Sequence, residues 1–224
     1  MSLLDTIDKQ TGPDPRASII VLHGLGADGN DFVPVAQELD LAAVGDVRFV
    51  FPHAPVIPVT INGGHEMRAW YDILGADLVQ REDEKGLRRS LAQVEALIVR
   101  EKSRGIPAER VVLAGFSQGC AMALLTGLRH AHRLGGIAGL SGYLPLAATT
   151  AAELHAANTS TPIFLAHGRM DPVVPLARAT ASRDALKSLG YPVEWHEYPM
   201  AHSVCMEEIA DLSRWLVGIL SKEA

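Results

Sequence analysis

The chain has 224 residues, of which 48% are hydrophobic, and a formal net charge of −6 at pH 7. This length allows one substantial core and leaves little room for two, so a single domain over residues 1–224 is expected. The acidic balance, without clustered Lys and Arg, argues against nucleic acid as a partner. Two cysteines, Cys120 and Cys205, are too few for a disulfide scaffold and match no metal-site spacing, so free thiols and no metal are predicted.

The first ten residues contain Asp5 and Asp8 and lack both a basic start and an apolar core. They do not have the pattern of a secretory signal, and a cytoplasmic location is expected. Residues 111–128 carry no charged side chain and are long enough to suggest a membrane span. Their three glycines, with a serine and a glutamine, fit a buried strand, a tight turn and a buried helix better, so no stable membrane insertion is predicted.

Short β-branched and aliphatic runs alternate with helical patterns along the chain. This alternation predicts an α/β fold with a mostly parallel sheet and helices on both faces. The expected strands are 18–22, 47–51, 111–114, 136–140, 163–166 and 193–198.

Between these strands, apolar residues at helical spacing predict a helix around 87–98 that ends before Gly105 and Pro107. A hairpin is expected within 59–73, with its turn at Asn62-Gly63. Residues 142–161 are predicted to form a loop with one short helix, which leaves no room for a large cap domain. The last helix is expected to bury one face, made of Met206, Ile209, Leu212, Leu216 and Ile219.

The strongest motif follows the strand that precedes residue 115. It reads Gly115-Phe116-Ser117-Gln118-Gly119 and fits the G-x-S-x-G nucleophile elbow, in which small flanking residues let the chain turn sharply and expose the serine hydroxyl. The pattern alone arises by chance, as a glycine-rich loop without chemistry. Here a clear strand precedes it and a nearly all-apolar helix follows, in the order that the motif requires, so Ser117 is predicted to be a nucleophile.

A serine needs a base, and the base needs an acid that fixes its tautomer. Of the histidines after Ser117, we expect His202 to be the base, because it lies just past the last strand, where ligands collect at the sheet edge. Asp171 follows the strand 163–166 and is the predicted acid; the same position would suit an Asp-Pro turn or a helix cap. The excluded candidates are His130 and His132 (far end of a helix), His196 (within a strand), His167 (before the acid) and Asp184 (mid-helix).

Attack on a carbonyl leaves negative charge on its oxygen, which hydrolases of this kind stabilise with two backbone N–H groups. The residue after the nucleophile, Gln118, is expected to supply one, and Leu25, in the glycine-rich loop 23–29, the other. The glycines of this loop also spell G-x-G-x-x-G, the phosphate-binding pattern of dinucleotide sites. No ribose-binding acid follows in a clean βαβ unit, so no cofactor is expected.

The chain resembles the type II carboxylesterases and acyl-protein thioesterases, the phospholipase/carboxylesterase family of α/β-hydrolases. The likeness rests on the following motifs: Leu22-His23-Gly24-Leu25-Gly26, Pro52-His53-Ala54-Pro55, Trp70-Tyr71-Asp72-Ile73, Gly105-Ile106-Pro107, Gly115-Phe116-Ser117-Gln118-Gly119, Asp171-Pro172-Val173-Val174-Pro175 and His202-Ser203. It implies the same triad and oxyanion donors, and an open acyl cleft lined by Trp70, Ile73 and Val173. A hairpin aromatic packed on the sheet is the alternative for Trp70.

The resemblance implies hydrolysis of short to medium acyl esters, and of thioesters or lysophospholipids in some relatives. Cys120 stands where relatives often have glycine, which raises the expectation of crowding at the helix start or of sensitivity to thiol reagents. Two alternatives remain at this stage: a serine peptidase or amidase with the same triad, and a catalytically silent binding module. The expected partner is a small acyl ester or thioester, and a homodimer is compatible with the sequence.

Overall fold

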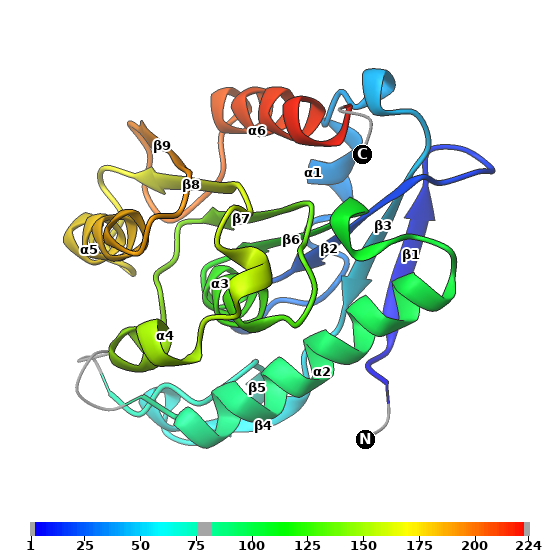
Figure 1. The fold of residues 1–224 in the computed structure, drawn as a ribbon. Coiled ribbons are helices and arrows are strands. Elements are labelled where there is room, and N and C mark those ends of the chain that lie inside the picture. The colour runs from blue at the N-terminus through cyan, green and yellow to red at the C-terminus, as the bar shows by residue number, and fades with distance from the viewer. Residues whose placement is uncertain (1–2, 76–81, 222–224) are drawn as a thin grey trace.

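Seven strands form one sheet in the computed structural model, which describes residues 3–75 and 82–221 (Figure 1). The order is β1-β3-β2-β6-β7-β8-β9, and every neighbouring pair is parallel except β1 with β3. The strands are β1 (Thr6–Gln10), β2 (Ala17–Leu22), β3 (Val47–Pro52), β6 (Val111–Phe116), β7 (Gly136–Leu140), β8 (Ile163–Gly168) and β9 (Val193–Tyr198).

Helices cover both faces of this sheet, with α1 and α6 on one face and α2, α3 and α5 on the other (Figure 1). The α-helices are α1 (Val33–Gln37), α2 (Glu84–Ser103), α3 (Gln118–Arg129), α4 (Ala147–Glu153), α5 (Leu176–Ser188) and α6 (Met206–Leu220). Short 3-10 turns are η1 (Ala42–Val44), η2 (Thr60–Asn62), η3 (Ala108–Arg110) and η4 (Ala156–Asn158). No helix in the described ranges is long and apolar enough to span a bilayer.

The six strands expected from the sequence are all present, within two residues at each end. Five of them lack alternation because both faces are buried, whereas β9, at the edge of the sheet, is only partly buried. In β2, Ile19 and Val21 pack into the core under α6, whereas Ile20 and Leu22 pack into the core under α2 and α3. A strand covered on both sides needs apolar residues at every position, which explains its uninterrupted run. The predicted mostly parallel α/β-hydrolase sheet is confirmed.

Strand β1 is not among the strands that the sequence predicts. It is a polar edge strand that pairs antiparallel with β3, and three of its five residues are exposed. Its sequence, Thr-Ile-Asp-Lys-Gln, shows no run of apolar residues that could signal a strand. An ion pair between Asp8 and Arg100 of α2, at 3.3 Å, joins the edge strand to the helix layer. Edge strands are often charged, which discourages pairing with other chains.

The segment between β3 and α2 forms the predicted hairpin, but its bounds differ from the expected 59–73. Its strands are β4 (Val56–Val59) and β5 (His65–Arg68), so the first strand begins three residues earlier than expected. The tip contains η2, and Gly63 and Gly64 have φ values of 67° and 79°. Glycine adopts this left-handed region without strain, which explains the glycine pair. Residues 142–161 form a loop with the short helix α4 and η4, and no cap domain, as predicted.

The predicted buried face of the last helix, α6, is confirmed except at its first residue. Ile209, Leu212 and Leu216 are buried in the core, and Ile219 is partly buried against it. Met206 is 60% exposed and does not belong to that face. It is the first residue of α6, where the helix emerges from the loop that carries His202. The periodicity holds along a helix, but its first turn can lie outside the layer that the rest of the helix covers.

A buried carboxyl group lies in the first turn of α6. The Glu208 side chain is inaccessible to solvent, and neither of its oxygens has a well-formed hydrogen bond within the described residues. Burial raises the pKa of Glu208 to about 8, partly opposed by the backbone of Cys205 at the start of the same helix. The folded protein therefore favours the protonated carboxyl group.

Because of this carboxyl group, we expect the free energy of unfolding to decrease as the pH rises. From the unfolded pKa of about 4.3 up to the folded pKa of about 8, the folded chain binds one proton more than the unfolded chain. The free energy of unfolding should then fall by up to about 1.4 kcal/mol per pH unit in that window. Urea denaturation at several pH values measures this slope. Glu208→Gln should flatten it, whereas Glu207→Gln, at the exposed neighbouring position, should not; equal slopes in wild type and Glu208→Gln would contradict the prediction.

Candidate active site

The G-x-S-x-G motif forms a sharp turn between β6 and α3. Ser117 has φ 57° and ψ −117°, a conformation that a non-glycine residue rarely adopts. Both flanking glycines are sterically required. A Cβ on Gly115 would lie 2.2 Å from the backbone of Gly119, and one on Gly119 would lie 1.9 Å from the carbonyl oxygen of Leu22. The turn thus forms only because these positions carry no side chain, and it presents the Ser117 hydroxyl above the sheet edge.

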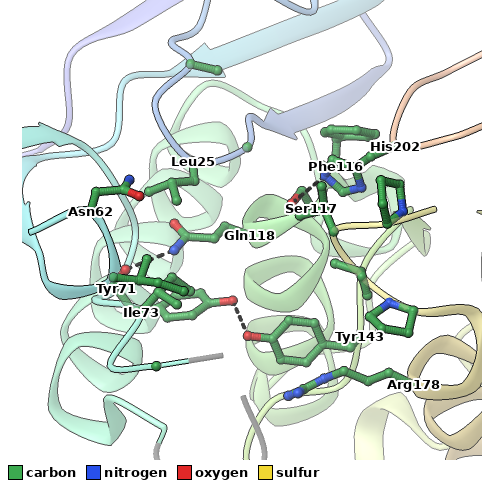
Figure 2. Close-up of a pocket in the computed structure, with 18 of the residues that line it drawn as sticks. Leu25, Asn62, Tyr71, Ile73, Phe116, Ser117, Gln118, Tyr143, Arg178 and His202 are labelled. Atoms are coloured by element: carbon green, nitrogen blue, oxygen red, sulfur yellow. Dashed lines mark hydrogen bonds between the residues drawn. The ribbon is translucent and has the colours of Figure 1, made fainter. Parts of the chain in front are cut away.

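The structure brings the three predicted triad residues together. The Ser117 Oγ lies 3.0 Å from His202 Nε2, and His202 Nδ1 lies 2.7 Å from Asp171 Oδ2. Figure 2 shows the serine and histidine side by side at one end of a cavity. The Phe116 ring contacts His202, with 4.7 Å between ring centroids. Each triad residue follows the carboxyl end of a different strand, β6, β8 or β9, as the sequence order required.

Asp171 is held from its other side by the backbone. Its Oδ1 accepts hydrogen bonds from the N–H groups of Val173, at 2.8 Å, and Val174, at 2.9 Å. The aspartate therefore also makes the turn that the sequence suggested, whereas α5 begins after Pro175 and is not capped by it. His167 is buried beside it and donates from Nε2 to the Val174 carbonyl oxygen at 2.8 Å. These bonds leave Oδ2 aimed at His202.

Two of the excluded histidines, His196 and His130, make contacts away from the triad. His196 Nε2 lies 2.8 Å from a Glu194 oxygen, and its ring stacks on Phe164. His130, at the end of α3, contacts Glu95 at 2.6 Å. Asp184, the alternative acid on α5, accepts a hydrogen bond from Arg183.

Two backbone N–H groups belong to residues that line the cavity beside Ser117. Those of Leu25 and Gln118 have no hydrogen-bond acceptor within the part of the chain that the structure describes. Leu25, Ser117 and Gln118 all line the same cavity (Figure 2). The backbone of Gly24 approaches the serine so closely that a Cβ there would lie 3.4 Å from the Ser117 Cβ. Two unused donors beside a nucleophile are the arrangement that can bind a developing oxyanion.

The cavity has a volume of about 1340 Å³ and extends from Ser117 between the hairpin and α5. Its mainly apolar lining is typical of a small-molecule binding site. Ile73 and Val173 line it, as expected, and Val173 is 58% exposed at its mouth. Other residues that line it include Phe32, Ile61, Asn62, Tyr71, Phe116, Tyr143, Pro175, Ala177, Arg178 and Ala181.

Trp70 does not line this cavity, which corrects the expected cleft role. Its side chain is inaccessible and belongs to the core under α2 and α3. The neighbouring Tyr71 reaches the cavity instead, and its hydroxyl lies 2.7 Å from that of Tyr143 (Figure 2). The Arg178 guanidinium lies 3.7 Å from the centroid of the Tyr143 ring. Tyr143 and Arg178 were not predicted from the sequence, because no motif sets them apart from other loop and helix residues.

Cys120 fits the helix start without crowding. A Cβ on Gly139 would lie 2.6 Å from the Cys120 sulfur, and one on Gly142 would lie 2.4 Å from its Cβ. These two glycines therefore leave the space that the thiol fills. Burial raises the pKa of Cys120 to about 12. A buried thiol that stays protonated is a poor nucleophile, so the structure gives no support to the expected sensitivity to thiol reagents at this residue.

The fold and this hydrogen-bonded serine, histidine and aspartate define a serine hydrolase of the α/β-hydrolase class. Residues 7–219 match the Phospholipase/Carboxylesterase family, and the chain belongs to it. This confirms the resemblance that the motifs suggested.

Named relatives agree with this membership. The chain is 42% identical over 205 residues to acyl-protein thioesterase 1 of Yarrowia lipolytica, covering 89% of this chain and 90% of that one. It is 43% identical over 217 residues to acyl-protein thioesterase 1 of Neurospora crassa, covering 93% and 89%. Among solved structures, acyl-protein thioesterase 2 of Zea mays superposes with a TM-score of 0.84 at 31% identity, covering 96% of this chain and 99% of that one.

Proposed function

We propose that the protein hydrolyses acyl esters and acyl thioesters through a covalent acyl-enzyme on Ser117. The continuous chain of hydrogen bonds from Ser117 through His202 to Asp171 carries the proposal. It lies beside an apolar cavity and two backbone N–H groups that have no acceptor among the described residues. The names of the fungal and maize relatives support the thioester part, because they are acyl-protein thioesterases.

The geometry supports a two-stage reaction. The Ser117 Oγ attacks the acyl carbonyl carbon while His202 Nε2 takes the hydroxyl proton. Asp171 holds Nδ1 and stabilises the imidazolium that forms. The carbonyl oxygen becomes an oxyanion that accepts hydrogen bonds from the N–H groups of Leu25 and Gln118. Collapse breaks the bond to the alcohol or thiol, which leaves with the proton from Nε2, and a water then hydrolyses the acyl-enzyme by the same steps.

The cavity lining favours an aliphatic acyl group over a peptide. Ile73, Val173 and Ala177 present hydrocarbon along the space that begins at Ser117, so an acyl chain can leave water there. Residues 142–161 form a loop with α4 and η4 and no cap domain. A site without a cap domain suits leaving groups of different sizes, from a small alcohol to a cysteine on a protein surface.

A matched substrate series tests this proposal. Octanoyl p-nitrophenyl ester, octanoyl thioester and octanoyl p-nitroanilide share one acyl chain and differ in the bond that breaks. We expect turnover of the ester and the thioester, and a kcat/KM for the anilide lower by about three orders of magnitude or more, since the amide is the less reactive bond. Comparable turnover of the anilide would favour the amidase alternative, and no turnover of any would favour a silent binding module.

A further inference from the structure

Trp70 is buried in the core, yet all its polar groups are used. Its indole Nε1 donates to the carbonyl oxygen of His23 at 2.8 Å, and its backbone N–H donates to Gln118 Oε1 at 3.0 Å. The Ser90 hydroxyl of α2 donates to its carbonyl oxygen. Trp70 therefore bridges the loop that carries Leu25 and the helix that begins at Gln118.

The Gln118 side chain completes this bridge. Its Nε2 donates to the Tyr71 carbonyl oxygen at 2.9 Å, so one amide group holds two successive backbone groups of residues 70–71. Figure 2 shows the Gln118 amide reaching across the cavity wall to Tyr71. Only one orientation of the amide satisfies both hydrogen bonds, because its oxygen must accept from a backbone N–H and its nitrogen must donate to a carbonyl oxygen.

His23 orients the peptide group that contains one oxyanion donor. Its Nε2 accepts from the backbone N–H of Ala54 at 3.0 Å, so the proton is on Nδ1, which donates to the Gly24 carbonyl oxygen at 2.7 Å. The Gly24 carbonyl and the Leu25 N–H belong to the same planar peptide unit and point in opposite directions. Fixing that carbonyl therefore aims the Leu25 N–H away from His23.

We propose that His23, Trp70 and the Gln118 side chain form a brace that sets the direction and spacing of the two oxyanion-binding N–H groups. This inference rests on the proposed function of Leu25 and Gln118. The N–H of Gln118 begins α3 and that of Leu25 lies in a loop, so neither element alone fixes the distance between them. The indole bond to His23 and the amide bonds to residues 70–71 join the two elements through Trp70.

The brace predicts an effect on the chemical step. Two donors stabilise an oxyanion only when both meet it at hydrogen-bond length, and misplacement by about 1 Å costs about a hundredfold in rate. The ground-state substrate depends on the apolar cavity instead, so its binding should change little. Trp70, His23 and the Gln118 side chain are positioning residues, since they act through the backbone donors.

Two substitutions test the brace without removing either donor. Trp70→Phe deletes the indole N–H and keeps an aromatic ring in the core, and Gln118→Met deletes the side-chain amide and keeps the backbone N–H. Trp215→Phe is the matched control, because Trp215 is also buried but lies on α6 and contacts Phe164 on the other face of the sheet. Melting temperatures of all three variants show whether each remains folded.

The measurements are kcat, KM and the inhibition constant of an alkyl trifluoromethyl ketone, whose adduct with Ser117 places an oxyanion in the same site. We expect kcat to fall by about 10- to 100-fold in both brace variants while KM changes by less than about threefold. The inhibition constant should rise by the same factor as kcat/KM falls. Trp215→Phe should keep wild-type values for all three.

The brace is overturned if folded Trp70→Phe and Gln118→Met retain wild-type kcat. It is equally overturned if Trp215→Phe loses as much activity as Trp70→Phe, because the loss would then follow general destabilisation. Ser117→Ala, assayed in parallel, separates this inference from the proposed function. An active Ser117→Ala defeats the proposed function, whereas an inactive Ser117→Ala beside fully active brace variants defeats only the brace.

Discussion

Ser117→Ala is expected to lower kcat for a p-nitrophenyl acyl ester by about four to six orders of magnitude, as removal of a serine nucleophile does in other hydrolases. The alanine removes the atom placed to attack the carbonyl carbon, the Oγ at 3.0 Å from His202 Nε2. Esters with acyl chains of graded length, assayed in wild type and variant, measure the loss and show whether it holds for every chain length.

The same variant should fold normally. The Ser117 hydroxyl caps no helix, so the alanine loses one hydrogen bond and keeps the same Cβ. We expect its free energy of unfolding to change by about 1 kcal/mol or less, measured by urea denaturation. A folded Ser117→Ala with activity near that of wild type would exclude Ser117 as the nucleophile.

Asp171→Asn should cost about 10³- to 10⁴-fold in kcat, although the new side chain has almost the same shape. The asparagine can still accept from the backbone at Oδ1, so the turn at Val173 and Val174 is retained. Its amide nitrogen, however, would face His202 Nδ1, where the carboxylate oxygen now lies at 2.7 Å. An amide N–H needs an acceptor there, which moves the imidazole proton to Nε2 and leaves no base for Ser117.

Asp184→Asn is the matched control for this substitution. Asp184 follows Asp171 along the chain and was the rival acid, but it lies on the exposed side of α5 next to Arg183. We expect its kcat to equal that of wild type. If Asp171→Asn kept wild-type kcat, or if Asp184→Asn lost as much, the acid of the triad would have been assigned to the wrong residue.

The triad could be predicted because it depends on strand ends. Parallel strands place their carboxyl ends at one edge, so a serine after β6, an aspartate after β8 and a histidine after β9 must come close together. The required order along the chain then removed the competing histidines. The assignment of Leu25 and Gln118 as oxyanion donors also rests on loop position and not on side-chain direction, and it stays a prediction.

The acyl cleft could not be predicted to the same degree, because side-chain direction decides it. Trp70 and Tyr71 are adjacent large aromatics, and the sequence does not tell which one turns into the core. The structure buries Trp70 and directs Tyr71 to the cavity. Tyr143 and Arg178 meet Tyr71 from a loop and from α5, through contacts between segments far apart in the sequence.

Other expectations depend on properties outside a single folded chain. The cytoplasmic location, the homodimer and the absence of a nucleic acid partner stay predictions from the sequence. The edge strand β1 was missed for a local reason, since its polar residues face solvent and carry no apolar pattern. An apolar pattern thus reveals strands that are at least partly buried, including the other edge strand β9, and overlooks a polar edge strand such as β1.

Mass spectrometry of the protein after treatment with an alkyl fluorophosphonate tests the central claim most directly. The reagent phosphonylates an activated serine, with loss of fluoride and of the hydroxyl proton. We expect one adduct per chain, located on Ser117, formed rapidly in wild type and far more slowly in Asp171→Asn. An unlabelled wild-type protein, or an adduct on another residue with Ser117 unmodified, would contradict the assignment of Ser117 as the nucleophile.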